Sequence, residues 1–292
     1  MLTNGSCTQI SALVRRIIAP NPSPYTYTGT CTYIVGHEDV AIIDPGPASE
    51  GHIETLLSAI KGEKLRHILV THTHKDHSSA AQMLQEKTGA KILGCTPHRF
   101  FRDLACDEVN HLEASADLAF SPDCVLKTSD DIMGNGWKLT ALETPGHTMN
   151  HVCYALDQEK ILFSGDHVMG WSTPMIAPPD GQMRAYMNSL NILRNRDDAL
   201  FLPGHGDAIT EPRRFVRAMI HHRKHREAAI LMRIQAGDTC IAQIVASVYE
   251  KLAPALIGAA RLTTLAHVES LVHDQLVTCD GALTLNSVLS AV

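Results

Sequence analysis

The sequence predicts an α/β protein in which β-sheets are covered by helices, with a small helical domain at its end. Three observations support this fold class. Short β-branched runs alternate with amphipathic segments over the first two-thirds of the chain, several strands follow one another over residues 123–165, and two helices with a hairpin close the sequence. With 292 residues and 45% hydrophobic side chains, the chain can bury a sizeable core in one large domain, or in one plus a small one.

The first half is expected to alternate strands with helices. Residues 52–64 have the apolar spacing of an amphipathic helix, and residues 78–90 form a second helix that begins with serine and ends near glycine. The expected strands are rich in β-branched and apolar residues and cover 31–36, 40–43, 65–70 and 91–94.

The second half adds further strands before a long helical region. Helices are expected over 180–193 and over 211–237, the latter beginning with proline and ending at glycine. The expected strands cover 124–129, 137–144, 151–156, 160–165 and 199–206, with a hairpin turn at 157–160.

Composition and charge argue against several classes of protein. The formal net charge of −6 disfavours a surface built to hold nucleic acid or anionic lipid, although it allows a local basic patch. No apolar run approaches the roughly 18 residues of a membrane span, and the N-terminus lacks a signal-peptide core. The eight cysteines contain no Cys-x-x-Cys pair, so we expect them to be reduced and mostly buried. A cytoplasmic location is the resulting expectation.

Histidines are the unusual feature of the composition, and they cluster. Three of the 17, His72, His74 and His77, fall within six positions together with Asp76. They follow an apolar β-branched run and precede a helical pattern, which predicts a tight turn at the end of a strand. On such a segment His72 and His74 can point to one side, while Asp76 and His77 reach a second point nearby.

Three further candidates occupy comparable places. His147, Asp166 and His205 each follow an apolar strand and lie beside glycine or proline. Imidazole nitrogen and carboxylate oxygen are ligands that divalent zinc prefers, and a catalytic site leaves one position open for water. Five histidines and two aspartates exceed what one tetrahedral ion needs. The count indicates two ions about 3.5–4 Å apart, with an aspartate and a hydroxide between them.

For each histidine alone, the alternative is a satisfied core or surface residue, which is the common case. For all seven side chains together, that alternative leaves too many buried polar groups unpaired. Zinc is the expected metal, while iron and manganese suit the same ligands.

The motif THTHKDH (71–77), followed in order by TPGHT, SGD and PGHG, is similar to the metal motifs of the metallo-β-lactamase superfamily. The resemblance spans about the first 210 residues and implies a four-layer αββα sandwich with the metals at one edge. Carried over residue by residue, it implies one metal held by His72, His74 and His147, a second held by Asp76, His77 and His205, and a bridging Asp166.

Particular residues exclude some branches of that superfamily. His74 stands where the oxygen-reducing diiron branch carries glutamate, which favours hydrolysis over redox chemistry. Asp166 occupies a bridging position that true β-lactamases usually lack, so antibiotic cleavage is not the expected function. Persulfide dioxygenases share the histidine motif but use one iron, and they are a minor alternative.

The expected mechanism follows from such a site. Two cations lower the pKa of bound water towards about 7, so that a metal-bridging hydroxide attacks a carbonyl or phosphoryl centre. Asp76 is the expected catalytic residue, since it would orient that hydroxide. Asp44 is a candidate to orient a ligating imidazole. The alternative, which is about as well supported, is that it only forms an Asp-Pro-Gly turn. His151 and His167 are expected to support the site or to pack against it.

Candidate substrate-binding residues lie beyond the metal motifs. Trp171, in the loop of residues 168–182, either lines an apolar pocket with Met175 and Met183 or packs with them on the core.

His222 and Arg226 lie on one stripe of the helix 211–237 that turns from apolar to basic. They suit an anion-binding edge, although a solvated basic face with local ion pairs is favoured.

The tail, residues 235–292, is predicted as a separate domain after a catalytic domain of residues 1–234. Helices over 239–252 and 261–277 with a hairpin at 278–286 are typical of a winged-helix pattern. Because this tail has few basic residues and more acids, DNA contact is not favoured. Packing, dimerisation or shaping of the substrate cleft is expected instead.

The whole arrangement resembles the β-lactamase-like protein 2 branch, whose members include single-strand-specific endoribonucleases. Glyoxalase II is a poorer match, because its glutathione-binding positions have no clear counterpart here. The leading hypothesis is a dinuclear zinc hydrolase that cleaves a small ester, thioester or lactone. The second is RNA cleavage at the same centre, which 5% aromatic residues and an acidic net charge weaken.

A third, non-enzymatic hypothesis is a DNA-binding regulator that senses metal. The expected partner is a small-molecule substrate, with no membrane and no favoured nucleic acid, and the sequence leaves a homodimer open.

Overall fold

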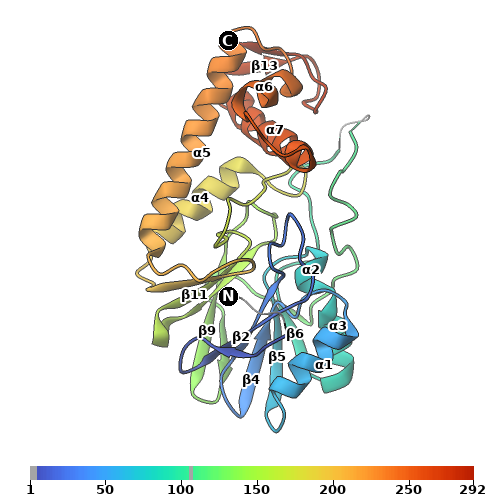
Figure 1. Cartoon of the computed structure of the whole chain (residues 1–292), viewed down its shortest axis with the longest axis vertical. Helices are drawn as coiled ribbons and strands as arrows, with labels where there is room; N and C mark the ends of the chain where they lie inside the picture. Colours follow the sequence, from blue (N-terminus) through green and yellow to red (C-terminus); the bar gives the residue numbers. More distant parts are fainter. Residues whose placement is uncertain (1–4, 105–107) are drawn as a thin grey trace.

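The computed structural model describes residues 5–104 and 108–292, and two stacked β-sheets form its centre (Figure 1). Strands β1 to β7 make a seven-stranded sheet in sequence order, and the second sheet has five strands in the order β12-β11-β10-β9-β8. The first sheet contains β1 Thr8–Gln9, β2 Val14–Ile18, β3 Cys31–Val35, β4 Asp39–Ile43, β5 Lys64–Val70, β6 Lys91–Gly94 and β7 Cys124–Val125. The second contains β8 Asp131–Gly134, β9 Trp137–Glu143, β10 Val152–Leu156, β11 Ile161–Gly165 and β12 Leu200–Pro203.

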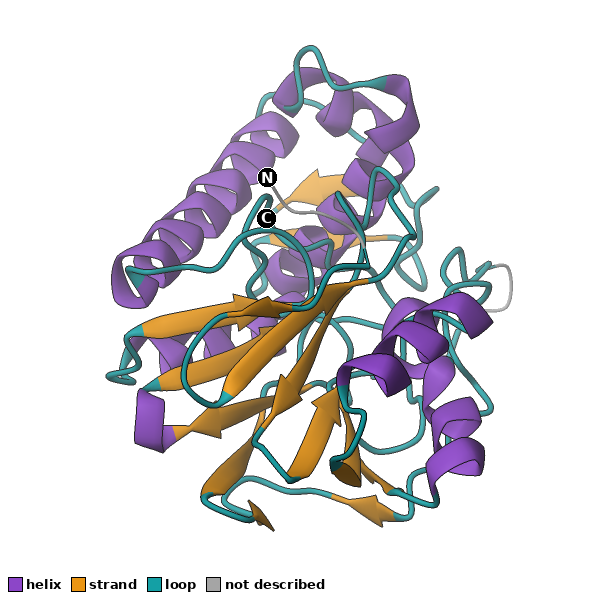
Figure 2. Ribbon diagram, turned by 60° about the horizontal axis from the view of Figure 1, so that its bottom comes forward, coloured by secondary structure: helices purple, strands orange, loops and turns teal. Residues whose placement is uncertain are grey.

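Helices cover the outer faces of both sheets, so four layers result (Figure 2). On the side of the seven-stranded sheet lie α1 Glu50–Ala59, α2 Lys75–Ser78 and α3 Ala80–Thr88. On the side of the five-stranded sheet lie α4 Met183–Arg194 and α5 Pro212–Gln235. The fold class predicted from the sequence is therefore confirmed.

Strand β10 illustrates how the sheets are sandwiched. Val152, Tyr154 and Leu156 belong to the core between the sheets, whereas Cys153 and Ala155 pack beneath α4 and α5. Successive side chains of a strand point to opposite faces, so this apolar strand is buried on both. The five-stranded sheet is thus an inner layer of the molecule.

Parallel strand pairs bring several strand ends to one edge. β4 and β5 pair in parallel within the first sheet, and β11 and β12 do so within the second. The carboxyl ends of the strands in each pair therefore point the same way, and the segments that follow β5, β11 and β12 carry six of the seven predicted ligands.

The C-terminal part has a core of its own. Ile230 and Ile234 of α5 pack there with residues from all the later elements except the 3₁₀ turn η2 Pro254–Leu256. The elements that pack there are α6 Ile241–Val248, α7 Ile257–His273 and the antiparallel strands β13 Val277–Cys279 and β14 Leu289–Ala291. The strands lie outside most of the predicted hairpin segment 278–286, so the hairpin loop is longer than expected. The domain boundary at 235 and the winged-helix assignment stay predictions.

Some local predictions were wrong. The strand expected over 124–129 ends at Val125, because the Lys127 N–H donates to the Asp130 carboxylate at 2.8 Å and the chain turns there. Strands β1, β2 and β8 were not predicted, although the Asn135-Gly136 pair between β8 and β9 is a strong hairpin signal. The turn at 157–160 is confirmed as a 3₁₀ turn, η1 Asp157–Glu159, between β10 and β11.

Among the described residues, no helix combines the length and the apolar character needed to cross a lipid bilayer.

Trp137 is expected to contribute strongly to stability. Its ring is 1% exposed, and its indole N–H donates to the Asp39 carbonyl at 2.8 Å. Trp137→Ala should lower the free energy of unfolding by about 3–5 kcal/mol, because it leaves a large cavity and an unpaired carbonyl. Denaturant titration followed by circular dichroism measures this loss. Met133→Ala, at a 61% exposed position of the adjacent strand, is the control, and equal losses for both variants would contradict the prediction.

Candidate metal centre

The seven predicted ligands meet at one edge of the sandwich. His72, His74, Asp76 and His77 follow β5 and enter α2, and the remaining three come from the segments after β9, β11 and β12. Their donor atoms fall into three overlapping groups, each within 4.8 Å: His72, His74 and His147; His72, His77 and Asp166; and Asp76, His77 and His205.

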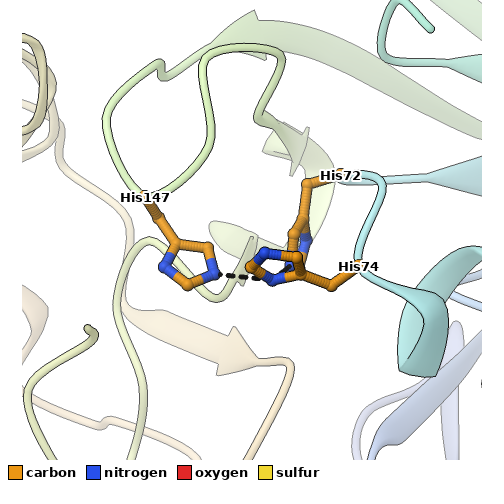
Figure 3. Close-up of side chains that lie close together, drawn as sticks. All are labelled: His72, His74 and His147. Carbon is orange, nitrogen blue, oxygen red and sulfur yellow. Dashed lines mark hydrogen bonds between the residues drawn. The ribbon is translucent and has the colours of Figure 1, made fainter. Parts of the chain in front are cut away.

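Three imidazoles form the first group (Figure 3). His74 Nδ1 lies 3.1 Å from His72 Nε2 and 3.1 Å from His147 Nε2. All three rings are buried. Nitrogen atoms at this spacing suit one cation bound at about 2.0–2.1 Å from each.

The group of Asp76, His77 and His205, called the second group from here on, combines two imidazoles with a carboxylate. His77 Nε2 lies 3.2 Å from His205 Nε2, and Asp76 Oδ2 lies 3.3 Å from the former and 3.2 Å from the latter. These donors suit a second cation.

Asp166 lies between the two groups. Its Oδ1 is 3.5 Å from His77 Nε2, and its Oδ2 is 3.3 Å from His205 Nε2 and 3.8 Å from His147 Nε2. Oδ1 is buried and accepts no hydrogen bond from the described part of the chain. A buried oxygen that accepts no hydrogen bond can be satisfied by a bound cation instead.

Asp44 supports one imidazole from behind. Its buried carboxylate accepts hydrogen bonds from the Thr71 N–H and hydroxyl, both at 2.8 Å, and from His77 Nδ1 at 2.9 Å. The backbone of Asp44 has a φ of 49°, in the left-handed region that few non-glycine residues occupy. The residue therefore both turns the chain after β4 and holds His77 with its Nε2 towards the cluster.

His151 and His167 lie behind the first group. The His151 ring stacks on His72 with centroids 5.2 Å apart, and its Nδ1 lies 2.8 Å from the Thr144 hydroxyl. His167 packs on the Tyr186 ring at 4.6 Å. These contacts agree with supporting and packing roles.

Gly204 permits the close approach of the ligands. A Cβ atom at this position would lie 2.4 Å from Asp166 Oδ1 and 2.7 Å from His77 Cε1. The glycine before His205 is therefore required by the cluster itself.

Burial sets the protonation of two imidazoles. It lowers the pKa of His72 well below its usual value and that of His147 to about 4. Both rings are neutral at pH 7, which is the form that binds metal.

The second group has the opposite electrostatics. Burial lowers the pKa of His77 and His205, but the carboxylates of Asp76 and Asp166 outweigh it, so the pKa of His205 is raised to about 9 and that of His77 lies well above its usual value. Burial also disfavours charge on the two aspartates, yet the adjacent imidazoles hold the pKa of both carboxyls well below the usual range.

The candidate substrate-binding residues have different surroundings. Trp171 is 37% exposed and stacks on Tyr27, whereas Met183 is 1% exposed and packs in the core beneath α4. The guanidinium of Arg226 lies 4.0 Å from the centroid of the Tyr249 ring and donates to a carbonyl of α6 at 2.8 Å. His222 is exposed on α5. A role of Trp171, His222 and Arg226 in substrate binding stays a prediction.

Sequence reasoning missed three residues around this site. The buried Asp180 lies beside His74, the side chain of His98 lies against the other carboxylate oxygen of Asp180, and Tyr27 stacks on Trp171. A carboxylate directly after Pro178-Pro179 is the signal that could have drawn attention to Asp180, which instead was taken as the start of a helix.

Comparison with known proteins agrees with this geometry. The metallo-beta-lactamase superfamily profile matches residues 25–205. A beta-lactamase-like protein 2 homolog of Drosophila melanogaster is 32% identical over 231 residues, covering 77% of this chain and 74% of that protein. An atrochrysone carboxyl ACP thioesterase of Aspergillus chevalieri is 25% identical over 255 residues, covering 82% and 74%. A beta-lactamase domain protein from Burkholderia ambifaria shares the fold, with a TM-score of 0.83 at 17% identity over 100% of this chain and 95% of that one.

The fold and the cluster define a metal-dependent hydrolase. The chain belongs to the metallo-beta-lactamase superfamily, since the profile matches more than half of its length. The Drosophila relative confirms the resemblance to the β-lactamase-like protein 2 branch.

Metal binding to a metal-free preparation should release protons. At pH 7 His205 carries a proton, because its pKa is raised to about 9, and only the neutral imidazole binds metal. We expect release of about one to two protons per chain, and an affinity for Zn²⁺ that weakens as the pH falls below about 9. Titration calorimetry in two buffers of different ionisation enthalpy measures the release. Equal binding heats in both buffers would count against the prediction.

Proposed function

We propose that this chain is a dinuclear zinc hydrolase that cleaves a small ester, thioester or lactone. The observation that carries the proposal is the position of Asp166, whose oxygens lie within 3.8 Å of nitrogen atoms from both groups of donors. A carboxylate shared between two cations is a common arrangement in two-metal hydrolases. In the proposal one zinc ion is bound by His72, His74 and His147, and the other by Asp76, His77 and His205.

The residues of the chain would divide the catalytic work. Bound zinc would supply an acidified water as nucleophile and polarise the substrate carbonyl. The Asp76 side chain is 27% exposed, more than the other six donors, and its Oδ2 accepts a hydrogen bond from the Thr30 hydroxyl at 3.2 Å. Asp76 is therefore placed to orient the attacking water, accept its proton and return that proton to the leaving alkoxide or thiolate.

An aromatic pair beside the cluster favours a substrate with an apolar part. The rings of Tyr27 and Trp171 stack with centroids 5.1 Å apart and an interplanar angle of 12°. Their loops adjoin the cluster, because the Gly170 N–H donates to the His205 carbonyl at 3.0 Å and His205 Nδ1 lies 3.3 Å from the Gly29 carbonyl. The backbone of Tyr27 has a φ of 57°, a conformation that tends to occur at functional sites.

The same loops disfavour RNA as the substrate. Residues 20–30 and 168–182 contain no lysine or arginine. RNA binding depends on cationic contacts to phosphate, which these loops do not offer. The thioesterase named among the relatives adds support for a thioester.

A cytoplasmic location belongs to the same proposal. The described cysteines, Cys7, Cys31, Cys95, Cys124, Cys153, Cys240 and Cys279, are free thiols, which suits a reducing compartment.

Elemental analysis with parallel assays of a thioester, a lactone and a single-stranded RNA tests the proposal. The purified protein should contain about two zinc ions per chain and hydrolyse the thioester or the lactone. Asp76→Ala should lower kcat by about 100–10,000-fold, since it removes both a donor and the proton acceptor. Asp197→Ala, at an exposed ion pair with Lys160, is the matched control and should keep full activity.

Two results would overturn the proposal. Turnover of RNA alone would select the endoribonuclease alternative, and one iron per chain without hydrolysis would select a mononuclear oxygenase.

Substrate binding by the aromatic pair is tested separately. Trp171→Ala should raise KM for an apolar thioester by about 3–10-fold with a smaller change in kcat, because stacking contributes to binding and not to bond cleavage. Met232→Ala, at a 60% exposed site on α5, should change neither constant. An unchanged KM in Trp171→Ala would remove the aromatic pair from the substrate site.

A further inference from the structure

The loop of residues 168–182 contacts two ligands of the first group from behind. The Met175 carbonyl accepts a hydrogen bond from His147 Nδ1 at 2.8 Å, and Asp180 Oδ2 lies 3.6 Å from His74 Nε2. In both imidazoles the other ring nitrogen is the one that converges on the cluster. The loop thus faces His147 Nδ1 and His74 Nε2. The other nitrogen of each ring, His147 Nε2 and His74 Nδ1, stays free for a cation.

Asp180 is the unexpected member of this arrangement. Its carboxylate is fully buried, and His98 Nε2 lies 3.4 Å from its Oδ1. Within residues 5–104 and 108–292, neither oxygen of Asp180 makes a hydrogen bond of good geometry, and the same is true of Nε2 in His74 and His98. A buried carboxylate without partners is strongly unfavourable, so these four atoms are partners for one another.

Hydrogen bonds around Thr73 favour one tautomer of His98. The Asn150 amide donates to the Thr73 hydroxyl at 2.9 Å and to the Thr96 carbonyl at 2.8 Å, while its oxygen accepts from Thr148 at 2.8 Å. The Thr73 hydroxyl, already an acceptor, is then free to donate its own hydrogen to His98 Nδ1 at 2.8 Å. In that arrangement a neutral His98 carries its proton on Nε2 and points that N–H at Asp180 Oδ1, 3.4 Å away.

We propose that Asp180, held by His98, is a positioning residue that fixes the orientation and tautomer of His74 for metal binding. The inference rests on the proposed function, since it concerns the cation bound by His72, His74 and His147. Two N–H groups face the two carboxylate oxygens, which satisfies both sides and leaves His74 Nδ1 unprotonated towards the cluster.

Asp44 performs the equivalent task for the second group. Its carboxylate accepts from His77 Nδ1 at 2.9 Å and lies on the opposite sheet from the Asp180 loop. The two cation sites therefore depend on separate carboxylates, which makes the inference testable by comparing the two.

The experiment compares Asp180→Asn with Asp44→Asn by elemental analysis and by zinc titration against a chromophoric chelator. The asparagine keeps the size of the side chain but turns an N–H towards an imidazole N–H. Each variant should bind one of its two zinc ions about 10–100-fold more weakly and hold about one ion per chain after dialysis. The double variant should hold less than one, because each substitution affects a different ion.

A second pair of variants separates positioning from packing. His98→Leu removes the donor that faces Asp180 and should weaken zinc binding, whereas His98→Gln keeps an N–H there and should restore most of it. Circular dichroism and thermal unfolding of the metal-free proteins show whether each variant is folded.

Folded Asp180→Asn protein that keeps both ions at wild-type affinity would overturn the inference, as would a double variant no weaker than either single one. If the wild type binds only one ion, the dinuclear proposal fails. The role of Asp180 is then decided by whether Asp180→Asn weakens that ion at least about tenfold.

Discussion

The gathering of seven polar ligand-type side chains, six of them buried, at one edge of two sheets is the constraint on which the rest of the structure depends. Two carboxylates and five imidazoles cannot share such a space unless their charges are compensated. Strand ends deliver them from both sheets, and Gly204 gives them room. In the protein alone, protonated His77 and His205 balance Asp76 and Asp166; cations would take over that balance when they bind.

The loops around the cluster serve two purposes at once. The loop of residues 168–182 carries Trp171 at its start, the Met175 carbonyl in its middle and Asp180 near its end. The segment before β3 likewise carries Tyr27 and, through the Gly29 carbonyl, faces His205. A change in how these loops pack would therefore alter substrate contacts and ligand orientation together.

The sequence allowed prediction of the features that depend on neighbouring residues. The THTHKDH turn, the glycine-flanked ligands and most strands follow from short-range patterns, because strand ends and turns have local chemical signatures. The Asp180–His98–His74 contacts join three distant segments through a loop whose shape has no local signature. The Tyr27–Trp171 stack and the Arg226–Tyr249 contact escaped prediction for the same reason.

Anomalous X-ray diffraction at the zinc absorption edge, on crystals of the protein purified with its metal, tests the central claim most directly. The proposed function predicts two anomalous peaks about 3.5–4 Å apart, one among the imidazoles of His72, His74 and His147 and one beside Asp76, His77 and His205, with Asp166 reaching both. A single peak, or peaks away from these donors, would contradict a dinuclear centre at this edge of the sheets.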